Sequence, residues 1–197
     1  AADAATKEGP LDPVRSFVVT LIGVVSIVTC TFGNLAAYGQ RNIKRMLAYS
    51  TIAHAGFMMM PVAAAVALVG IGNTAAAAEA IAALMLYATI YLFMNLGAFA
   101  IIAFMRNSMQ SEEIKDYSGL IGRSPVIAVA MTLILVSLVG LPPLAGFWPK
   151  LRVLQALYEA GGPLLMFVMV AAAINTAISL VYYLRVAKTM CIDSPPD

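Results

Sequence analysis

The stretch PVIAVAMTLILVSLVGLPPLAGFWPKLRVLQALY, residues 125–158, is a long apolar segment with two interruptions. The first is GLPPLAG at 140–146, where two consecutive prolines remove backbone donors and the flanking glycines let the chain bend. The second is Lys150, which has apolar residues on both sides. An unbroken helix over this span would be about 50 Å long, against roughly 30 Å of bilayer hydrocarbon. The stretch therefore predicts one membrane crossing made of two half-helices, an arrangement typical of ion-moving membrane proteins.

The composition places the chain among α-helical membrane proteins. It is 61% hydrophobic and 11% charged, whereas a soluble domain carries about 25% charged residues. Several apolar runs exceed the roughly 18 residues that predict a transmembrane helix, and they lack the alternation of β-barrel strands. The net charge of +2 is too small to suggest nucleic acid as a partner. Cys30 and Cys191 show no metal-ligand spacing, so we expect two free thiols.

We expect an all-α fold with about five transmembrane helices in a single membrane domain, residues 16–188. Residues 1–15 form a polar lead-in, in which Pro10 and Pro13 discourage helix before Val14, and residues 189–197 form a polar tail. The expected helices cover residues 16–38, 44–69, 77–105, 125–158 with its break, and 164–187.

Positive charges alternate between the two sides of this arrangement. One side receives Arg41, Lys44, Arg45, Arg106, Lys115, Arg123, Arg185 and Lys188. The other side receives Lys7 and Arg15, and the loops at 70–76 and 160–163 contain no Lys or Arg. By the positive-inside rule the basic side faces a bacterial cytoplasm or a mitochondrial matrix, and the N-terminus faces the opposite side.

Lys150 is the strongest candidate for ion movement. A lysine near the bilayer centre costs about 3 kcal/mol on insertion scales and usually faces the bundle interior or water. Burial also disfavours its charged form, which favours proton exchange. The alternative is that its side chain reaches the outer interface along Trp148 and Leu151. Because Pro149 suits the start of a helix, we expect the second half-helix to begin at Lys150.

His54 lies ten residues into the second expected helix, roughly at mid-membrane. Tyr49, Ser50 and Thr51 are polar neighbours, and Ser50 is four residues earlier, on the same helix face. Histidine is a natural proton relay. The alternative is a neutral histidine whose hydrogen bonds are satisfied by a neighbouring helix.

Other polar residues have structural interpretations. Lys44 opens the second helix at the basic side and is interpreted as a topology anchor. Glu79 opens the third helix, where an acidic residue suits the helix dipole, and is interpreted as a cap. Asn34, Asn95 and Asn175 predict hydrogen bonds between helices, with water along a path as the alternative.

Five stretches together resemble one known family. They are GNLAAYGQRNIKRMLAYSTIAHAGF, YATIYLFMNLGAFAIIAF, IKDYSGLIGRSPVIA, VSLVGLPPLAGFWPKLRVLQA and AISLVYYLRVAK. They resemble the C-terminal part of subunit N of respiratory complex I, called subunit 2 in mitochondria, which is related to Mrp-type antiporter subunits. LAYS-x-I-x-H-x-G and GLPPLAGF-x-x-K are specific for the group. The YYLRV ending, and lysine rather than glutamate in the broken helix, favour subunit N.

The resemblance implies that the five helices are the ninth to thirteenth of an antiporter-like fourteen-helix fold. Lys150 falls on the family's lysine in the second broken helix, proposed as its terminal proton-loading site. His54 falls on a histidine that can link the hydrated central axis. Candidate supporting residues are Lys44, Tyr49, Ser50, Glu79 and Asn175, and the break is formed by Gly140, Pro142, Pro143 and Gly146.

The resemblance also implies partners and cofactors. The chain would be a proton-translocating subunit of NADH:ubiquinone oxidoreductase that makes no covalent chemistry and binds no cofactor or metal. NADH, FMN, iron–sulfur clusters and quinone are expected in other subunits. The family's other broken helix and its last helix are absent from this sequence. We therefore expect a split subunit, with the N-terminal helices on a separate chain, surrounded by other membrane-arm subunits and by membrane lipids.

The expected location is the mitochondrial inner membrane, with the N-terminus in the intermembrane space and the C-terminus in the matrix. A bacterial plasma membrane and a thylakoid are alternatives. Two other functions fit the resemblance less closely. One is a subunit of an Mrp-type cation/proton antiporter or a membrane-bound hydrogenase, and the other is a structural fragment needed only for assembly.

Overall fold

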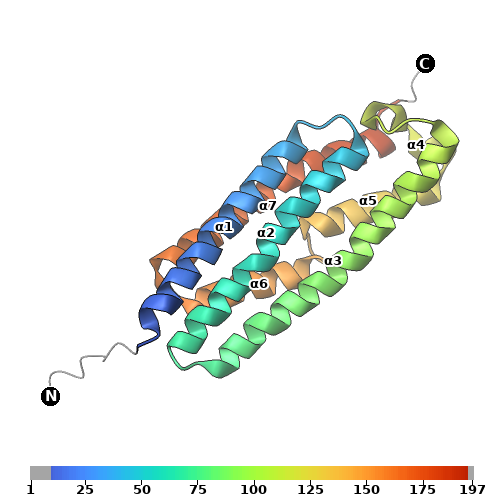
Figure 1. Ribbon diagram of the computed structural model, residues 1–197. Helices are drawn as coiled ribbons and strands as arrows, with labels where there is room; N and C mark the ends of the chain where they lie inside the picture. The colour runs from blue at the N-terminus through green and yellow to red at the C-terminus, as the bar shows by residue number, and fades with distance from the viewer. Residues whose placement is uncertain (1–9, 195–197) are drawn as a thin grey trace.

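The computed structural model describes residues 10–194 as an elongated helix bundle (Figure 1). Four helices run its length: α1 (Asp12–Tyr38), α2 (Ile43–Gly70), α3 (Thr74–Met109) and α7 (Gly162–Cys191). A broken pair, α5 (Pro125–Val139) and α6 (Phe147–Ala160), completes the bundle. The link between α3 and α5 contains a 3-10 turn, η1 (Ile114–Tyr117), and α4 (Leu120–Arg123). The predicted all-α membrane bundle is confirmed.

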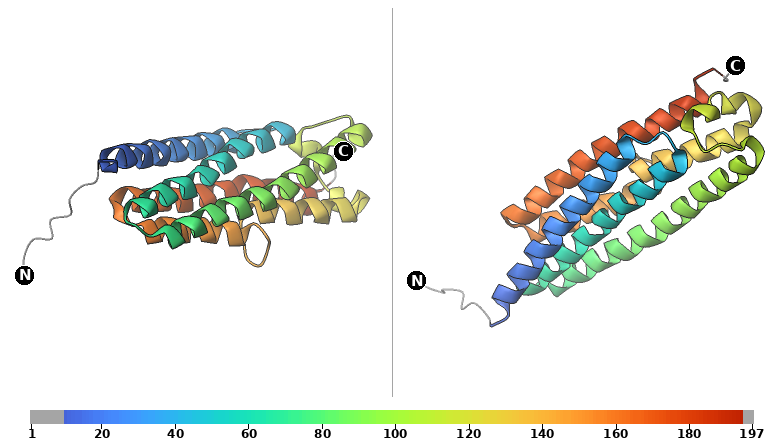
Figure 2. Two further views of the ribbon diagram at one scale, coloured as in Figure 1. Left: turned by 60° about the horizontal axis from the view of Figure 1, so that its bottom comes forward. Right: turned by 45° about the horizontal axis from the view of Figure 1, so that its top comes forward.

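The broken pair acts as one crossing. α1, α2, α3 and α7 are each long and apolar enough to span a membrane. α5 has 15 residues and α6 has 14, so each spans only about 21–23 Å. Figure 1 shows α5 starting at the end of the bundle where α3 finishes, and α6 leading on to the opposite end. The link between them projects from the bundle at mid-length (Figure 2).

Several helices extend beyond the bounds expected from the sequence, among them α3, which covers Thr74–Met109 where 77–105 was expected. α1 begins at Asp12 with Pro13 in its first turn, so the prediction that these prolines delay the helix is wrong. Amide groups in a first turn have no intrahelical partner, and proline is therefore tolerated there. α7 continues to Cys191, so the expected polar tail at 189–197 begins inside a helix.

Glu79 does not cap α3. The helix begins at Thr74, and the Asn73 side chain accepts a hydrogen bond of 3.1 Å from the backbone N–H of Ala76. Glu79 therefore lies beyond the first turn, with an exposed side chain. The capping prediction is wrong because the expected boundary at residue 77 overlooked Asn73, a residue type that favours helix starts.

Glycines bring α1 and α2 into close contact. A Cβ at Gly33 would overlap the backbone of Ala53, and a Cβ at Gly56 would lie 2.5 Å from the backbone nitrogen of Cys30. Small residues at such interfaces let membrane helices approach closely. This contact fixes the middle of α2, which carries His54.

The interior consists of two apolar clusters with polar residues between them. One cluster, toward the C-terminal end of α7, includes Met46 and Tyr117, and the other, toward the opposite end, includes Phe57 and Val153. Away from the two ends of the bundle, the buried polar side chains of the described residues are Ser26, Asn34, Ser50, His54, Ser137, Lys150, Asn175 and Ser179. This polar layer contains the candidate site.

Lys44 belongs to an ion-pair cluster at the basic end of the bundle. The Glu112 carboxylate lies 3.6 Å from Lys44 Nζ and 3.2 Å from Arg106 Nε. Asn42 donates a 3.1 Å hydrogen bond to the same carboxylate, and the Ile43 N–H donates to the Glu112 carbonyl at 2.9 Å. The cluster ties the link after α3 to the start of α2.

We expect Gly56→Ala to destabilise the bundle, because the new methyl group meets the Cys30 backbone and α1 must move away from α2. Overpacking of this kind costs about 1–3 kcal/mol and lowers the unfolding temperature measured in detergent. Gly39→Ala is the control, since nothing lies within 4 Å of a Cβ there. Equal unfolding temperatures for the two variants would contradict the close packing.

Glu112 gives the basic end a pH dependence. Its pKa lies below the ordinary value of 4.5, because Asn42 donates a hydrogen bond to the carboxylate and Lys44 and Arg106 lie nearby. A lowered folded-state pKa contributes stability that is complete above the ordinary pKa and is lost as the pH falls through the lowered value. We therefore expect Glu112→Gln to lose less stability than the parent protein when unfolding temperatures are measured from about pH 7 to about pH 3. Parallel curves for the two proteins would refute this role.

Candidate functional site

The helix break is set by a left-handed residue. Gly140 has φ of +88°, a conformation that glycine adopts without a steric penalty, and α5 ends at Val139. The Gly140 N–H donates to the Ser137 carbonyl at 2.9 Å. The Pro142–Pro143 peptide that follows is cis. The predicted break therefore lies where the glycine and proline residues indicated.

Ser137 joins the two half-helices. Its hydroxyl accepts a 3.0 Å hydrogen bond from the Gly146 N–H and donates to the sulfur of Met94 at 2.9 Å. A Cβ at Gly146 would overlap the Ser137 carbonyl, so only glycine allows the chain to pass this close. The first turn of α6 is thereby held against the last turn of α5.

Lys150 points from the first turn of α6 to the C-terminal end of α5. Its Nζ donates to the carbonyls of Leu138 at 3.1 Å and Val139 at 2.7 Å, and lies 4.9 Å from the Phe57 ring centroid. The residue is 7% exposed, so its side chain turns to the break and not to the outer interface. Among residues 10–194, no carboxylate forms an ion pair with it. The partial negative charge of helix-end carbonyls is what faces this amine.

The second half-helix begins earlier than expected. α6 starts at Phe147, so Pro149 and Lys150 both lie in its first turn. The prediction of a start at Lys150 is wrong, because a first turn tolerates proline at more than one position. Lys150 is consequently held on a helix and not in the unwound link.

His54 lies in a chain of hydrogen bonds that crosses three helices. Its Nδ1 pairs with the Tyr87 hydroxyl of α3 at 2.8 Å, and its Nε2 with the Tyr183 hydroxyl of α7 at 3.3 Å. The Tyr183 hydroxyl also hydrogen-bonds to Ser50 Oγ, one turn before His54 on α2. Neighbouring helices thus satisfy both ring nitrogens. The same contacts provide a continuous series of exchangeable protons from Ser50 to Tyr87.

His54 and Lys150 line one small enclosed space. Tyr87, Tyr91 and Ser137 contribute to its walls, and the space is too narrow to admit a water molecule. The Tyr91 ring centroid lies 4.7 Å from that of His54. In this packing the hydrogen-bonded chain and the lysine are adjacent but not connected, so proton exchange between them requires the space to widen.

Asn175 belongs to a second network, between α1 and α7. Asn34 donates to the Asn175 side-chain oxygen at 2.9 Å, and Asn175 donates to Thr31 at 3.0 Å. The Tyr182 hydroxyl donates to Asn34 at 3.0 Å, and the Tyr182 ring packs on Tyr183 with centroids 4.5 Å apart. The predicted interhelical hydrogen bonds are present for Asn34 and Asn175.

The structure brings together part of the predicted set. Lys150, His54 and Ser50 lie in the polar layer, and Asn175 lies in the adjoining network. The remaining predicted residues lie outside the polar layer. Tyr49 packs on Phe32, and Lys44 is at the basic end. Glu79 is exposed and lies beside Arg152 at the other end.

Two functional candidates were missed from the sequence, namely Tyr87 and Tyr183. Both place a hydroxyl on His54. A signal existed, because Tyr87 and Tyr91 are four residues apart and share a helix face, and Tyr182 and Tyr183 are adjacent within an apolar run. Which of these hydroxyls faces His54 depends on how the helices pack.

Comparison with known proteins gives a consistent assignment. A model of the NADH:quinone oxidoreductase/Mrp antiporter transmembrane family matches residues 8–176. NADH-quinone oxidoreductase subunit N of Anaeromyxobacter sp. (strain Fw109-5) is 42% identical over 95% of this chain, which spans 36% of that relative's length.

Solved structures share the fold. A chain in the structure of respiratory complex I from Thermus thermophilus with bound aureothin is 31% identical, with a TM-score of 0.64 over 90% of this chain and 37% of that one. A chain in the Mrp complex from Dietzia sp. DQ12-45-1b is 21% identical, with a TM-score of 0.78 over 94% of this chain and 32% of that one. The chain belongs to the NADH:quinone oxidoreductase/Mrp antiporter transmembrane family.

Proposed function

We propose that this chain is part of the proton-translocating membrane arm of an NADH:quinone oxidoreductase, and that Lys150 binds a transferred proton. The observation that carries the proposal is the environment of Lys150: a buried amine at a helix break, facing two carbonyls and a ring, with no carboxylate partner among residues 10–194. Within the described part of the chain, no fixed counter-ion holds its charge. Its protonation therefore responds to charges that approach or leave the polar layer.

The hydrogen-bonded chain supports a direction for the path. A proton enters at the basic end, passes along Ser50, Tyr183 and His54, and reaches Lys150 when the enclosed space between them widens. It leaves past the break toward the opposite end of the bundle. Helices that lie outside this chain in the longer relatives complete the two half-channels, on the same or on a separate polypeptide.

The redox chemistry lies elsewhere in this proposal. NADH, FMN, iron–sulfur clusters and quinone belong to other subunits, and this chain makes no covalent chemistry. The basic end faces a matrix or cytoplasm by the positive-inside rule, so α1 begins at the outer side. The proposed location is an energy-coupling membrane. The mitochondrial inner membrane is the expectation from the sequence, and the bacterial relative supports the bacterial plasma membrane.

Lys150→Ala tests the proposal in the assembly that contains this chain, purified and reconstituted into vesicles. We expect fewer protons moved per NADH oxidised, because the proton-binding amine is gone. Arg152→Ala is the matched control, since Arg152 lies two residues further on with an exposed side chain.

An unchanged proton-to-NADH ratio in Lys150→Ala would refute pumping by this residue and favour a role in assembly alone. An assembly that exchanges cations for protons without oxidising NADH would refute the assignment to the oxidoreductase.

Tyr183→Phe tests the path. It removes the hydroxyl shared by Ser50 and His54 and keeps the ring, so we expect slower proton pumping in an assembly of normal composition. Tyr117→Phe is the control, because it removes a buried hydroxyl that donates to the Ser111 carbonyl at the basic end, outside the path. We expect it to lower stability by about 0.5–1.5 kcal/mol while pumping stays near that of the parent. Equal pumping rates in the two variants would mean that the Tyr183 hydroxyl serves packing only.

A further inference from the structure

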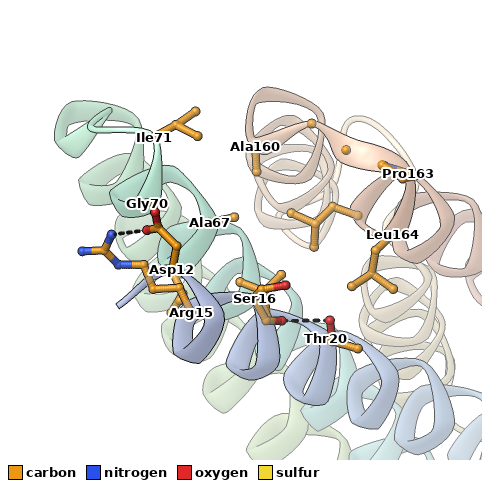
Figure 3. A pocket seen from close by; sticks show the side chains of 15 residues that line it. Asp12, Arg15, Ser16, Thr20, Ala67, Gly70, Ile71, Ala160, Pro163 and Leu164 are labelled. Carbon is orange, nitrogen blue, oxygen red and sulfur yellow. Dashed lines mark hydrogen bonds and ion pairs between the residues drawn. The ribbon is translucent and has the colours of Figure 1, made fainter. Parts of the chain in front are cut away.

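A hollow of about 540 Å³ lies at the end of the bundle opposite the basic cluster (Figure 3). It opens between the start of α1, the end of α2 and the turn from α6 into α7. In Figure 3, Ser16 and Thr20 of α1 face Leu164 of α7 across this gap, and Thr20 donates to the Ser16 carbonyl at 2.8 Å. Val19 and Leu165 add apolar lining. The hollow therefore has a polar mouth and apolar walls.

A second hollow adjoins the first. It measures about 380 Å³, lies between α2 and α3, and is lined by the apolar residues Val66, Val69, Ala77 and Ile81. Arg15 lines both hollows, as does Val66. The end of α2 thus has an apolar recess on each side, with one guanidinium between the two.

Arg15 is paired with an acid at this position. Its guanidinium lies 3.0 Å from the Asp12 carboxylate, and the two side chains are 34% and 37% exposed. The pair therefore presents one positive and one negative group at the mouth of the hollows, with no net charge. Around it, α1 exposes Val14, Phe17 and Leu21, so the surface that leads to the mouth is apolar.

We propose that the Arg15–Asp12 pair and the two hollows bind one zwitterionic phospholipid whose headgroup carries a primary ammonium, as in phosphatidylethanolamine. The phosphate accepts hydrogen bonds from the Arg15 guanidinium, whose fork suits a phosphate, and the ammonium lies by the Asp12 carboxylate. One acyl chain lies in each recess beside α2. Clusters of basic residues without acids select anionic lipids. The Arg15–Asp12 pair has no net charge and selects a headgroup that has no net charge either.

Photolabelling tests the site in native membranes that contain the chain in its assembly. A photoactivatable phosphatidylethanolamine is added, and the labelled peptides are identified by mass spectrometry. We expect label on residues 12–20 and 160–165, and competition by unlabelled phosphatidylethanolamine about tenfold stronger than by phosphatidylglycerol, since a charge-assisted hydrogen bond differs between them.

Two variants sharpen the test. Arg15→Gln should lower the labelling about tenfold, through loss of the phosphate contact. Asp12→Asn leaves a net positive mouth and should reverse the preference toward phosphatidylglycerol, a gain that a misfolded protein cannot show. Lys188→Gln is the control, because it breaks a comparable ion pair at the basic end, where Lys188 Nζ lies 3.5 Å from the Asp193 carboxylate. It should leave the labelling unchanged.

Three results would overturn the proposal. Label spread evenly over all lipid-facing helices would show bulk lipid only. Equal competition by the two lipids in the parent and in Asp12→Asn would show no headgroup recognition. A cross-link from this region to a polypeptide would show that another protein segment occupies the hollows.

Discussion

Lipid chains offer backbone groups no hydrogen-bond partner, so a helix can end within a bilayer only where protein atoms or enclosed water satisfy its last carbonyls. At the end of α5 this task falls to Lys150, which bonds to the carbonyls of Leu138 and Val139. The Ser137 hydroxyl satisfies the Gly146 amide at the start of α6. The break supplies acceptors for the buried lysine, and the lysine supplies donors for the end of α5. The rest of the polar layer is arranged around this joint.

The polar layer lies between two apolar clusters, and this environment sets the strength of its hydrogen bonds. In a low-dielectric interior, satisfied hydrogen bonds are stronger and unsatisfied ones are costlier. Ser50, His54 and the tyrosines that bond to them therefore hold α2, α3 and α7 together at the level of the lysine. Close contact of α1 with α2 at Gly33 and Gly56 keeps this level fixed. The hydrogen bonds of the polar layer therefore also help to pack the helices.

Local signals in the sequence predicted the break, the burial of Lys150 and His54, and the clustering of basic residues at one end. They succeeded because each rests on a property of a short segment, such as the left-handed Gly140 or an apolar run of membrane length. Glu79 and the start of α6 were misjudged because capping depends on one boundary residue. The roles of Tyr87 and Tyr183 were missed because helix rotation decides which hydroxyl meets His54, and rotation follows from packing across the whole bundle.

The geometry at the break also bears on what a proton transfer does to the fold. A lysine ammonium has three N–H donors, and a neutral amine keeps two. Two carbonyls, those of Leu138 and Val139, accept from Nζ. The joint between α5 and α6 therefore remains fully hydrogen-bonded whether or not the extra proton is present. Lys150 can therefore gain or lose a proton while Nζ keeps both hydrogen bonds to the end of α5. A change in its charge does not by itself break the joint.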